Sequence, residues 1–102
     1  MATRITLIYD NPVDPAAFEA GYPDQLALAG KIPDVQKREA AKVLPREDGS
    51  PTPAYRLLDL YFADYATASR AVTTDEAGAF FTRVFELATG GVRIVFADVE
   101  PV

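Results

Sequence analysis

Histidine and cysteine are both absent from the 102-residue sequence. Histidine is the commonest general base near neutral pH and the commonest metal ligand, and cysteine is required for thiolate catalysis, disulfide bonds and thiolate-bound zinc. These absences exclude histidine-dependent serine hydrolysis and haem with a histidine axial ligand. A tyrosinate ligand to haem, such as Tyr9 or Tyr22, stays open on residue type alone. We expect no metal site and no tightly bound cofactor.

Excess positive charge and long apolar runs are also lacking. Fifteen acidic residues against 10 basic ones give a formal net charge of -5, which disfavours binding to phosphate backbones. No run approaches the ~20 apolar residues of a membrane span, and residues 1–6 lack the apolar stretch of a signal peptide. We therefore expect a cytoplasmic protein that uses neither nucleic acid nor a membrane as a partner.

Length and composition predict a single domain spanning residues 1–102. Hydrophobic residues make up 49% of the chain and charged residues 25%. We find no internal repeat, linker or low-complexity segment. A domain of this size has a small core, so a large apolar face left open to water would remove a noticeable part of its stability.

Hydrophobic periodicity and turn residues predict four strands and three helical segments. The strands are expected at residues 5–9, 35–44, 54–62 and 92–99, and the helical segments from residue 14 to a stop at 31–34, from 64 to about 72, and from 75 or 76 to 88. Pro23 is expected to kink the first helix or divide it, because proline removes a backbone hydrogen bond and clashes with the preceding turn. The order β-α-β-β-α-β, with its second helical segment split, predicts a ferredoxin-like α+β fold with a four-stranded antiparallel sheet.

The last helix is expected to bury one stripe of side chains. Its apolar residues recur at spacings of three, four and seven, while its charged residues fall largely on the opposite side. The predicted stripe consists of Ala77, Phe81, Val84, Phe85 and Ala88.

Both faces of the predicted sheet are apolar, although helices cover only one of them. On the third strand Tyr55, Leu57 and Tyr61 alternate with Leu58, Leu60 and Phe62, and the fourth strand is apolar in both phases. A face of this kind needs a cover. The simplest cover is a second copy of the same sheet related by a two-fold axis, so we expect a homodimer through the sheet that forms a dimeric α/β barrel.

Segments along nearly the whole chain resemble the EthD proteins, a family named for ethyl tert-butyl ether degradation and built on the dimeric α/β barrel. The matching segments are Leu7-Ile8-Tyr9 with Pro12 and residues 14–18, residues 26–29 with 31–33, residues 48–51, residues 60–62 and residues 88–92. Each is common alone, but their order and spacing together are specific. The resemblance implies a catabolic or oxidoreductase-associated role, and related dimeric α/β-barrel families place a pocket between the sheet and its helices.

One position departs from the family pattern. Many EthD proteins carry a histidine followed by an apolar residue, proline and leucine, and the corresponding stretch here is Gln25-Leu26-Ala27-Leu28. Glutamine donates and accepts hydrogen bonds but takes no proton near pH 7. A proton-transfer role of that histidine is therefore not carried over, whereas ligand positioning by Gln25 remains compatible with the sequence.

Candidate ligand-binding residues are Tyr9, Tyr22, Gln25, Phe81 and Phe85. They lie on elements expected to face one another, and an apolar wall with one or two polar tips suits a small neutral or aromatic molecule. The alternative is that the aromatic residues only fill the core.

Asp59 is the candidate catalytic residue, since it lies in the middle of an apolar strand. A carboxylate in such a place is either paired or functional. One interpretation is an ion pair with Arg4, Lys37 or Arg93 of its own or a partner chain. The other is a general base whose pKa is raised by an apolar cavity.

Three functional hypotheses follow. The first is an EthD-like homodimer that binds a small hydrophobic compound, either as an oxidoreductase-like enzyme without tightly bound cofactor or as its accessory. In the second, Gln25 in place of the histidine marks a non-catalytic carrier. In the third, the dimer is purely structural.

Overall fold

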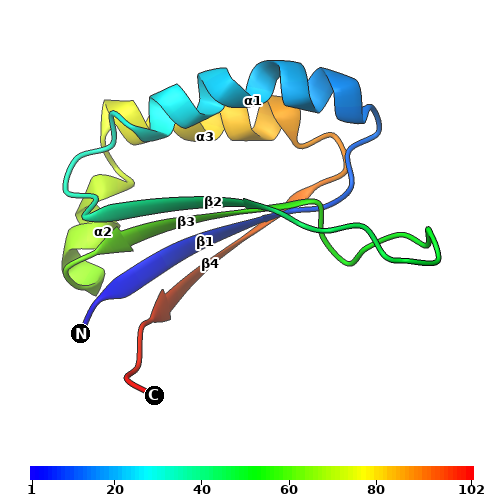
Figure 1. Ribbon diagram of the computed structural model, residues 1–102. Coiled ribbons are helices and arrows are strands. Elements are labelled where there is room, and N and C mark those ends of the chain that lie inside the picture. The colour runs from blue at the N-terminus through cyan, green and yellow to red at the C-terminus, as the bar shows by residue number, and fades with distance from the viewer.

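The computed structural model describes residues 1–102, which form seven elements. In chain order they are β1 (Thr3–Tyr9), α1 (Pro15–Ala29), β2 (Lys37–Lys42), β3 (Arg56–Phe62), α2 (Tyr65–Ala71), α3 (Asp75–Leu87) and β4 (Val92–Asp98). The strands form one antiparallel sheet in the order β2-β3-β1-β4. Helices α1 and α3 lie side by side over one face, and α2 lies at the end of the sheet near the start of β1 (Figure 1). This is the predicted ferredoxin-like α+β fold.

Each helix begins at a short polar residue that caps it. Asp14, Asp64 and Thr74 precede α1, α2 and α3, and the side chain of each accepts a hydrogen bond from the backbone N–H three residues later. Such caps satisfy donors that the first turn of a helix leaves free. The first two helices thus begin where the sequence predicts, at residues 14 and 64. None of the helices is both long and apolar enough to cross a membrane.

Helix α1 is one continuous helix although Pro23 lies inside it. Proline at this position removes the donor that would bond to the carbonyl of Glu19, and its ring lies on the exposed side of the helix. The predicted division into two short helices is therefore wrong. The buried residues of α1 keep one stripe across the proline: Phe18, Tyr22, Gln25 and Ala29.

The buried stripe of α3 differs from the predicted one. Its members are Ala77, Phe80, Val84 and Leu87, whereas Phe85 is 61% exposed. The contact with α1 explains this phase: a Cβ atom on Gly21 would lie 2.5 Å from Leu87 Cδ2, so the glycine makes the space that Leu87 fills. With Leu87 turned inward, the residue seven positions earlier, Phe80, lies on the same face.

The core lies between the sheet and helices α1 and α3. Alternate residues of the two central strands form its floor and are at most 1% exposed: Ile5, Leu7, Tyr9, Leu58, Leu60 and Phe62. The residues between them point to the opposite side of the sheet.

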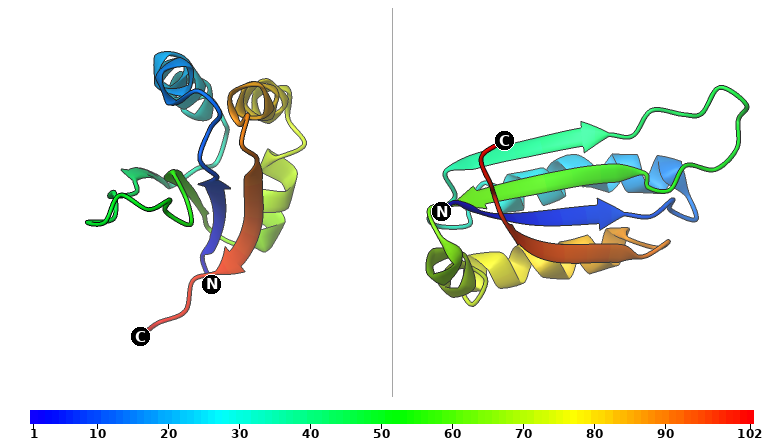
Figure 2. Two further views of the ribbon diagram at one scale, coloured as in Figure 1. Left: turned by 90° about the vertical axis from the view of Figure 1, so that its right-hand side faces the viewer. Right: turned by 90° about the horizontal axis from the view of Figure 1, so that it is seen from below.

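That opposite side, which we call the open face, carries no other element of the chain, as the view from below shows (Figure 2). Its central row pairs Arg4 with Tyr61, Thr6 with Asp59 and Ile8 with Leu57. Polar and apolar side chains therefore share this face, which is less apolar than the sequence pattern indicated. On β4, Val95 adds a side chain that is 46% exposed.

Candidate functional site

Three polar side chains converge inside the apolar interior between β1 and α1. Gln25 Nε2 donates a hydrogen bond to the Tyr9 hydroxyl at 2.5 Å, and both residues are fully buried. Tyr22, which is 4% exposed, precedes Gln25 by three residues and so lies on the same face of α1. We call Tyr9, Tyr22 and Gln25 the tyrosine–glutamine cluster.

Two atoms of this cluster are buried without a hydrogen-bond partner, namely the Tyr22 hydroxyl and Gln25 Oε1. An unpartnered buried polar atom costs about 1–3 kcal/mol, and folded proteins leave few of them without a reason. The cluster therefore has hydrogen-bonding capacity that the chain itself does not use.

Both tyrosines of the cluster are neutral phenols at pH 7. Burial raises the pKa of the Tyr9 hydroxyl, with a further contribution from the nearby Tyr22, and these effects outweigh the hydrogen bond from Gln25. Burial also raises the pKa of Tyr22, although the Arg56 guanidinium opposes the shift. Because Gln25 does not titrate, the cluster donates and accepts hydrogen bonds without exchanging protons near neutral pH.

Phe18 forms the aromatic wall beside the cluster. Its ring stacks on Tyr22 with centroids 5.3 Å apart at an interplanar angle of 25°, and its edge meets Tyr9 at 5.4 Å. Tyr55, just before β3, also packs against Phe18, with ring centroids 5.3 Å apart. Geometries of this kind stabilise aromatic clusters beyond the area that they bury.

An ion pair closes the cluster on the side of β3. The Arg56 guanidinium donates two hydrogen bonds to Glu19, from Nε at 3.0 Å and from Nη2 at 2.6 Å. Its carbon Cζ lies 4.4 Å from the centroid of the Tyr22 ring, in a cation–π arrangement. Lys42 adds a second cation 3.6 Å from Glu19.

A pocket of about 200 Å³ opens between the start of α1 and the end of α3. Its lining residues are Val13, Asp14, Ala17, Phe18, Glu86, Leu87 and Thr89. Two of them carry carboxylates and none carries a positive charge. Phe18 belongs both to this pocket and to the wall of the cluster, so its ring separates the pocket from Tyr22.

The structure brings three of the five candidate ligand-binding residues together as the tyrosine–glutamine cluster. Phe81 is half-buried and packs against Phe80 at 5.0 Å, while Phe85 is largely exposed and lies away from the interior. Sequence reasoning missed Phe18 as part of the site. Its position four residues before Tyr22 and seven before Gln25 on one helix is the signal that indicates it.

Asp59 lies on the open face, so the sheet separates it from the tyrosine–glutamine cluster. Its Oδ1 accepts a hydrogen bond from the Thr6 hydroxyl at 2.5 Å and lies 3.6 Å from Arg4 Nε. Arg4 is one of the cations that the sequence suggested as an ion-pair partner. A catalytic role of Asp59 stays a prediction.

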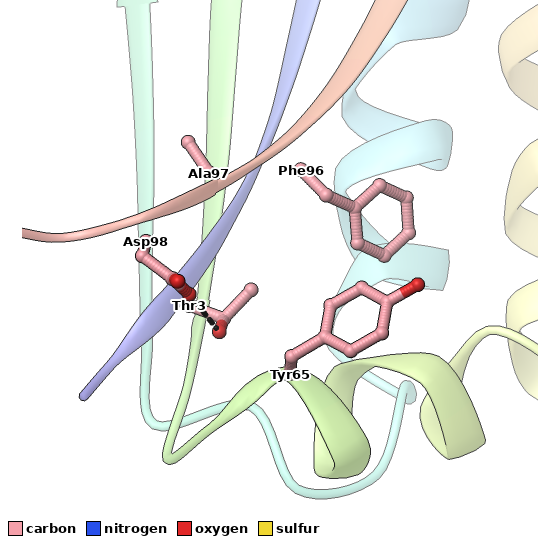
Figure 3. Close-up of a pocket in the computed structure, with 5 residues that line it drawn as sticks. All are labelled: Thr3, Tyr65, Phe96, Ala97 and Asp98. Atoms are coloured by element: carbon pink, nitrogen blue, oxygen red, sulfur yellow. Dashed lines mark hydrogen bonds between the residues drawn. The ribbon is translucent and has the colours of Figure 1, made fainter.

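A second hollow lies at the sheet edge between β4 and α2 (Figure 3). Tyr65 and Phe96 form its apolar side with ring centroids 6.0 Å apart, and the Thr3 hydroxyl already donates to Asp98 at 3.1 Å. This hollow measures about 140 Å³, and the Thr3 and Asp98 side chains in it are already hydrogen-bonded to each other. No group of three or more carboxylates gathers where a metal ion could bind.

Comparison with known proteins shows that this fold is similar to that of EthD-like proteins. No family model matches the chain. A crystal structure of an ethyl tert-butyl ether degradation (EthD) family protein from Bacillus halodurans C-125 superposes with a TM-score of 0.89 over 98% of this chain and 100% of that chain, at 21% identity. A dimeric ferredoxin-like protein of unknown function from Thermobifida fusca has a TM-score of 0.72 over 97% of this chain and 92% of that chain, at 12% identity. The EthD resemblance predicted from the sequence is thus confirmed by the fold.

The sequence match is closer to a protein from Rhodococcus erythropolis. The chain is 40% identical over 100 residues to the uncharacterized 11.0 kDa protein in the thcB-thcC intergenic region, covering 97% of this chain and 96% of that protein. The chain belongs to the same family as this Rhodococcus protein.

Proposed function

We propose that the protein is an EthD-like homodimer that binds a small hydrophobic or aromatic compound at the tyrosine–glutamine cluster. The observation that carries the proposal is the pair of buried, unpartnered polar atoms, the Tyr22 hydroxyl and Gln25 Oε1. They lie in an interior walled by aromatic and aliphatic side chains, with the Arg56–Glu19 ion pair on the side of β3. An apolar wall with a few convergent polar groups is the usual composition of a small-molecule site.

The chemistry of the cluster favours a carrier or binding role. Burial keeps both tyrosines protonated at pH 7, and Gln25 cannot replace a histidine as a proton acceptor. The side chains can hold and orient a ligand without taking a proton from it.

A catabolic or oxidoreductase-associated role without a tightly bound cofactor is the second proposal. Neutral phenols fixed in a dry interior can donate hydrogen bonds to negative charge that develops on a substrate oxygen. The likeness to an EthD structure supports this proposal through the fold alone. Turnover of a bound compound by the unmodified protein, or after Gln25→His, would favour catalysis, whereas binding without turnover would favour a carrier.

The proposed homodimer forms through the open face. The face combines apolar side chains, such as Ile8, Leu57 and Val95, with a paired set of charges at Arg4 and Asp59. A paired charge can be buried at an interface more readily than an unpaired one. The dimeric description of the Thermobifida protein of the same fold supports the proposal. We retain the cytoplasmic location expected from the sequence as part of it, to be tested by cell fractionation.

Ligand binding is tested by nuclear magnetic resonance titration with phenols, quinones and ethers. We expect at least one compound to shift the side-chain amide signals of Gln25 in a saturable way. The exposed Gln36 provides the internal control, and its amide signals should stay in place. If no compound shifts the Gln25 signals at millimolar concentration, the binding proposal is wrong.

Dimerisation is tested by light scattering. We expect a mass of twice 11.1 kDa at micromolar concentration. Val95→Arg should shift the protein to the monomer, since it adds a charge to the open face, whereas Val13→Arg, at a position 83% exposed near the start of α1, should leave the dimer intact. A wild-type protein that remains monomeric contradicts the proposed assembly.

A further inference from the structure

The hydrogen-bonding groups of the tyrosine–glutamine cluster restrict what kind of ligand can satisfy them. Within the cluster the chain makes one side-chain hydrogen bond, from Gln25 Nε2 to the Tyr9 hydroxyl. Gln25 Oε1 remains as an acceptor, and the Tyr22 hydroxyl remains as a group that both donates and accepts. The Tyr9 hydroxyl, which accepts from Gln25, keeps its own proton to donate. A ligand that fits must offer a hydrogen-bond donor to Gln25 Oε1 and either a donor or an acceptor to the Tyr22 hydroxyl.

A group that only accepts hydrogen bonds satisfies the Tyr22 hydroxyl but leaves Gln25 Oε1 without a partner. An ether or carbonyl oxygen accepts from the Tyr22 hydroxyl but gives nothing to Gln25 Oε1. A hydroxyl group donates to Gln25 Oε1 and accepts from Tyr22 at the same time.

The charges around the pocket also limit the ligand. Asp14 and Glu86 line the pocket between α1 and α3 and no cationic side chain does, and the chain carries a formal net charge of -5. Both features repel an anion at the mouth. An ammonium group bound at Tyr22 would have to be desolvated beside the Arg56 guanidinium, and the carboxylate there, Glu19, is already paired with Arg56, so its binding is unfavourable.

The pocket has room for one ring. It measures about 200 Å³, and an engineered apolar cavity of about 150 Å³ is known to bind benzene. Phe18 lines this pocket and also stacks on Tyr22, so it is the residue that the pocket and the cluster share.

We infer that the ligand class is a neutral, single-ring or similarly small compound that carries a hydroxyl group, such as a phenol or a cyclic alcohol, with the hydroxyl bound between Tyr22 and Gln25. The inference rests on the proposed binding function and adds the chemical class. The inference requires the Phe18 ring to move, so that a ligand in the pocket reaches Tyr22 and Gln25.

The test compares four probes of similar size: phenol, anisole, toluene and benzoate. Calorimetric affinities are measured for the wild-type protein, Tyr22→Phe and Gln25→Leu, with the exposed-site variants Tyr65→Phe and Gln36→Leu as matched controls. We expect phenol to bind more tightly than the other three probes. The ratio of phenol affinity to toluene affinity should fall at least tenfold in Tyr22→Phe and Gln25→Leu and stay within twofold in the controls.

The outcomes separate this inference from the proposed function. If phenol and toluene bind wild type equally, or if anisole matches phenol, a ligand site exists but the hydroxyl inference is overturned. Tightest binding of benzoate overturns it as well. If none of the four probes binds, both the proposed binding function and the inference are wrong. Because Tyr22→Phe removes only one buried oxygen, we expect this variant to fold, so its affinities can be compared with those of wild type.

Discussion

The Arg56 guanidinium lies over the Tyr22 ring, with Cζ 4.4 Å from the ring centroid, while it donates two hydrogen bonds to Glu19. Through this arrangement β3 fixes α1 at the turn of the helix that carries Tyr22. The hydrogen bonds from Arg56 lower the pKa of Glu19 and outweigh the opposing effect of burial. The ion pair therefore links the acidity of one carboxyl group to the stability of the site.

This link predicts a loss of stability in acid. Because the folded-state pKa of Glu19 lies below its ordinary value of 4.5, the pair contributes its full stability above that value and loses it as the pH falls through the folded-state pKa. Glu19→Gln should lower the free energy of unfolding by about 1–2 kcal/mol at pH 7. The difference in the free energy of unfolding between this variant and wild type should become smaller at low pH. Urea unfolding at a series of pH values measures the loss of stability at pH 7 and its change with pH, with Glu47→Gln in the exposed loop as the control. A deficit that is the same at low pH and at pH 7 would contradict the link.

Removal of the hydroxyl group should have opposite effects at the two tyrosines of the cluster. Tyr22→Phe removes an unpartnered buried oxygen and should be neutral or stabilising, by up to about 1 kcal/mol. Tyr9→Phe breaks the hydrogen bond to Gln25, leaves the amide without its partner, and should destabilise the protein by about 1–3 kcal/mol. Thermal unfolding without ligand measures both, and equal destabilisation by the two changes would show that Tyr22 has a partner after all.

The sequence predicted the elements well because strands and caps depend on local patterns. All four strands lie within two residues of their expected ends, and the prolines and aspartates that bound them act locally. The phase of α3 was predicted wrongly because Phe80 and Phe81 are equivalent in a periodic pattern. Only the contact between Leu87 and Gly21 decides which of them turns inward.

The candidate site could be predicted in part. The spacing of Tyr22 and Gln25 already places both on one face of a helix, and Tyr9 follows from the apolar alternation of the first strand. The unpartnered state of the Tyr22 hydroxyl depends on where Arg56 directs its donors. No sequence pattern encodes that direction, since it arises from the packing of β3 against α1.

Asp59→Asn should reveal whether the open face is buried in a dimer. In an isolated chain the pair with Arg4 is partly exposed, with side-chain exposures of 40% for Arg4 and 21% for Asp59, so its loss should cost about 0–1 kcal/mol. If a dimer buries the pair, removal of one charge leaves the other unpaired in the interface, and the loss should reach about 3 kcal/mol or more. Analytical ultracentrifugation measures the change in dimer affinity, and the melting temperature measures the change in stability. Unchanged stability and dimer affinity, combined with loss of a measurable turnover, would instead favour the general-base role.

Two glycines, Gly90 in the turn after α3 and Gly78 inside α3, should respond oppositely to alanine. A Cβ atom at Gly90 would lie 1.9 Å from the carbonyl oxygen of Asn11, so the turn after α3 could no longer pack against the loop after β1. Because a backbone atom cannot move aside as a flexible side chain can, Gly90→Ala should destabilise the protein by about 2 kcal/mol or more. Gly78 is exposed inside α3, and a Cβ atom added there would have no neighbour within 4 Å, so Gly78→Ala should stabilise the protein by about 0.5–1 kcal/mol through helix propensity. Urea unfolding measures the free energy of unfolding of both variants relative to wild type. If Gly90→Ala were as stable as wild type, the two loops would not be in the close contact that shapes the mouth of the pocket.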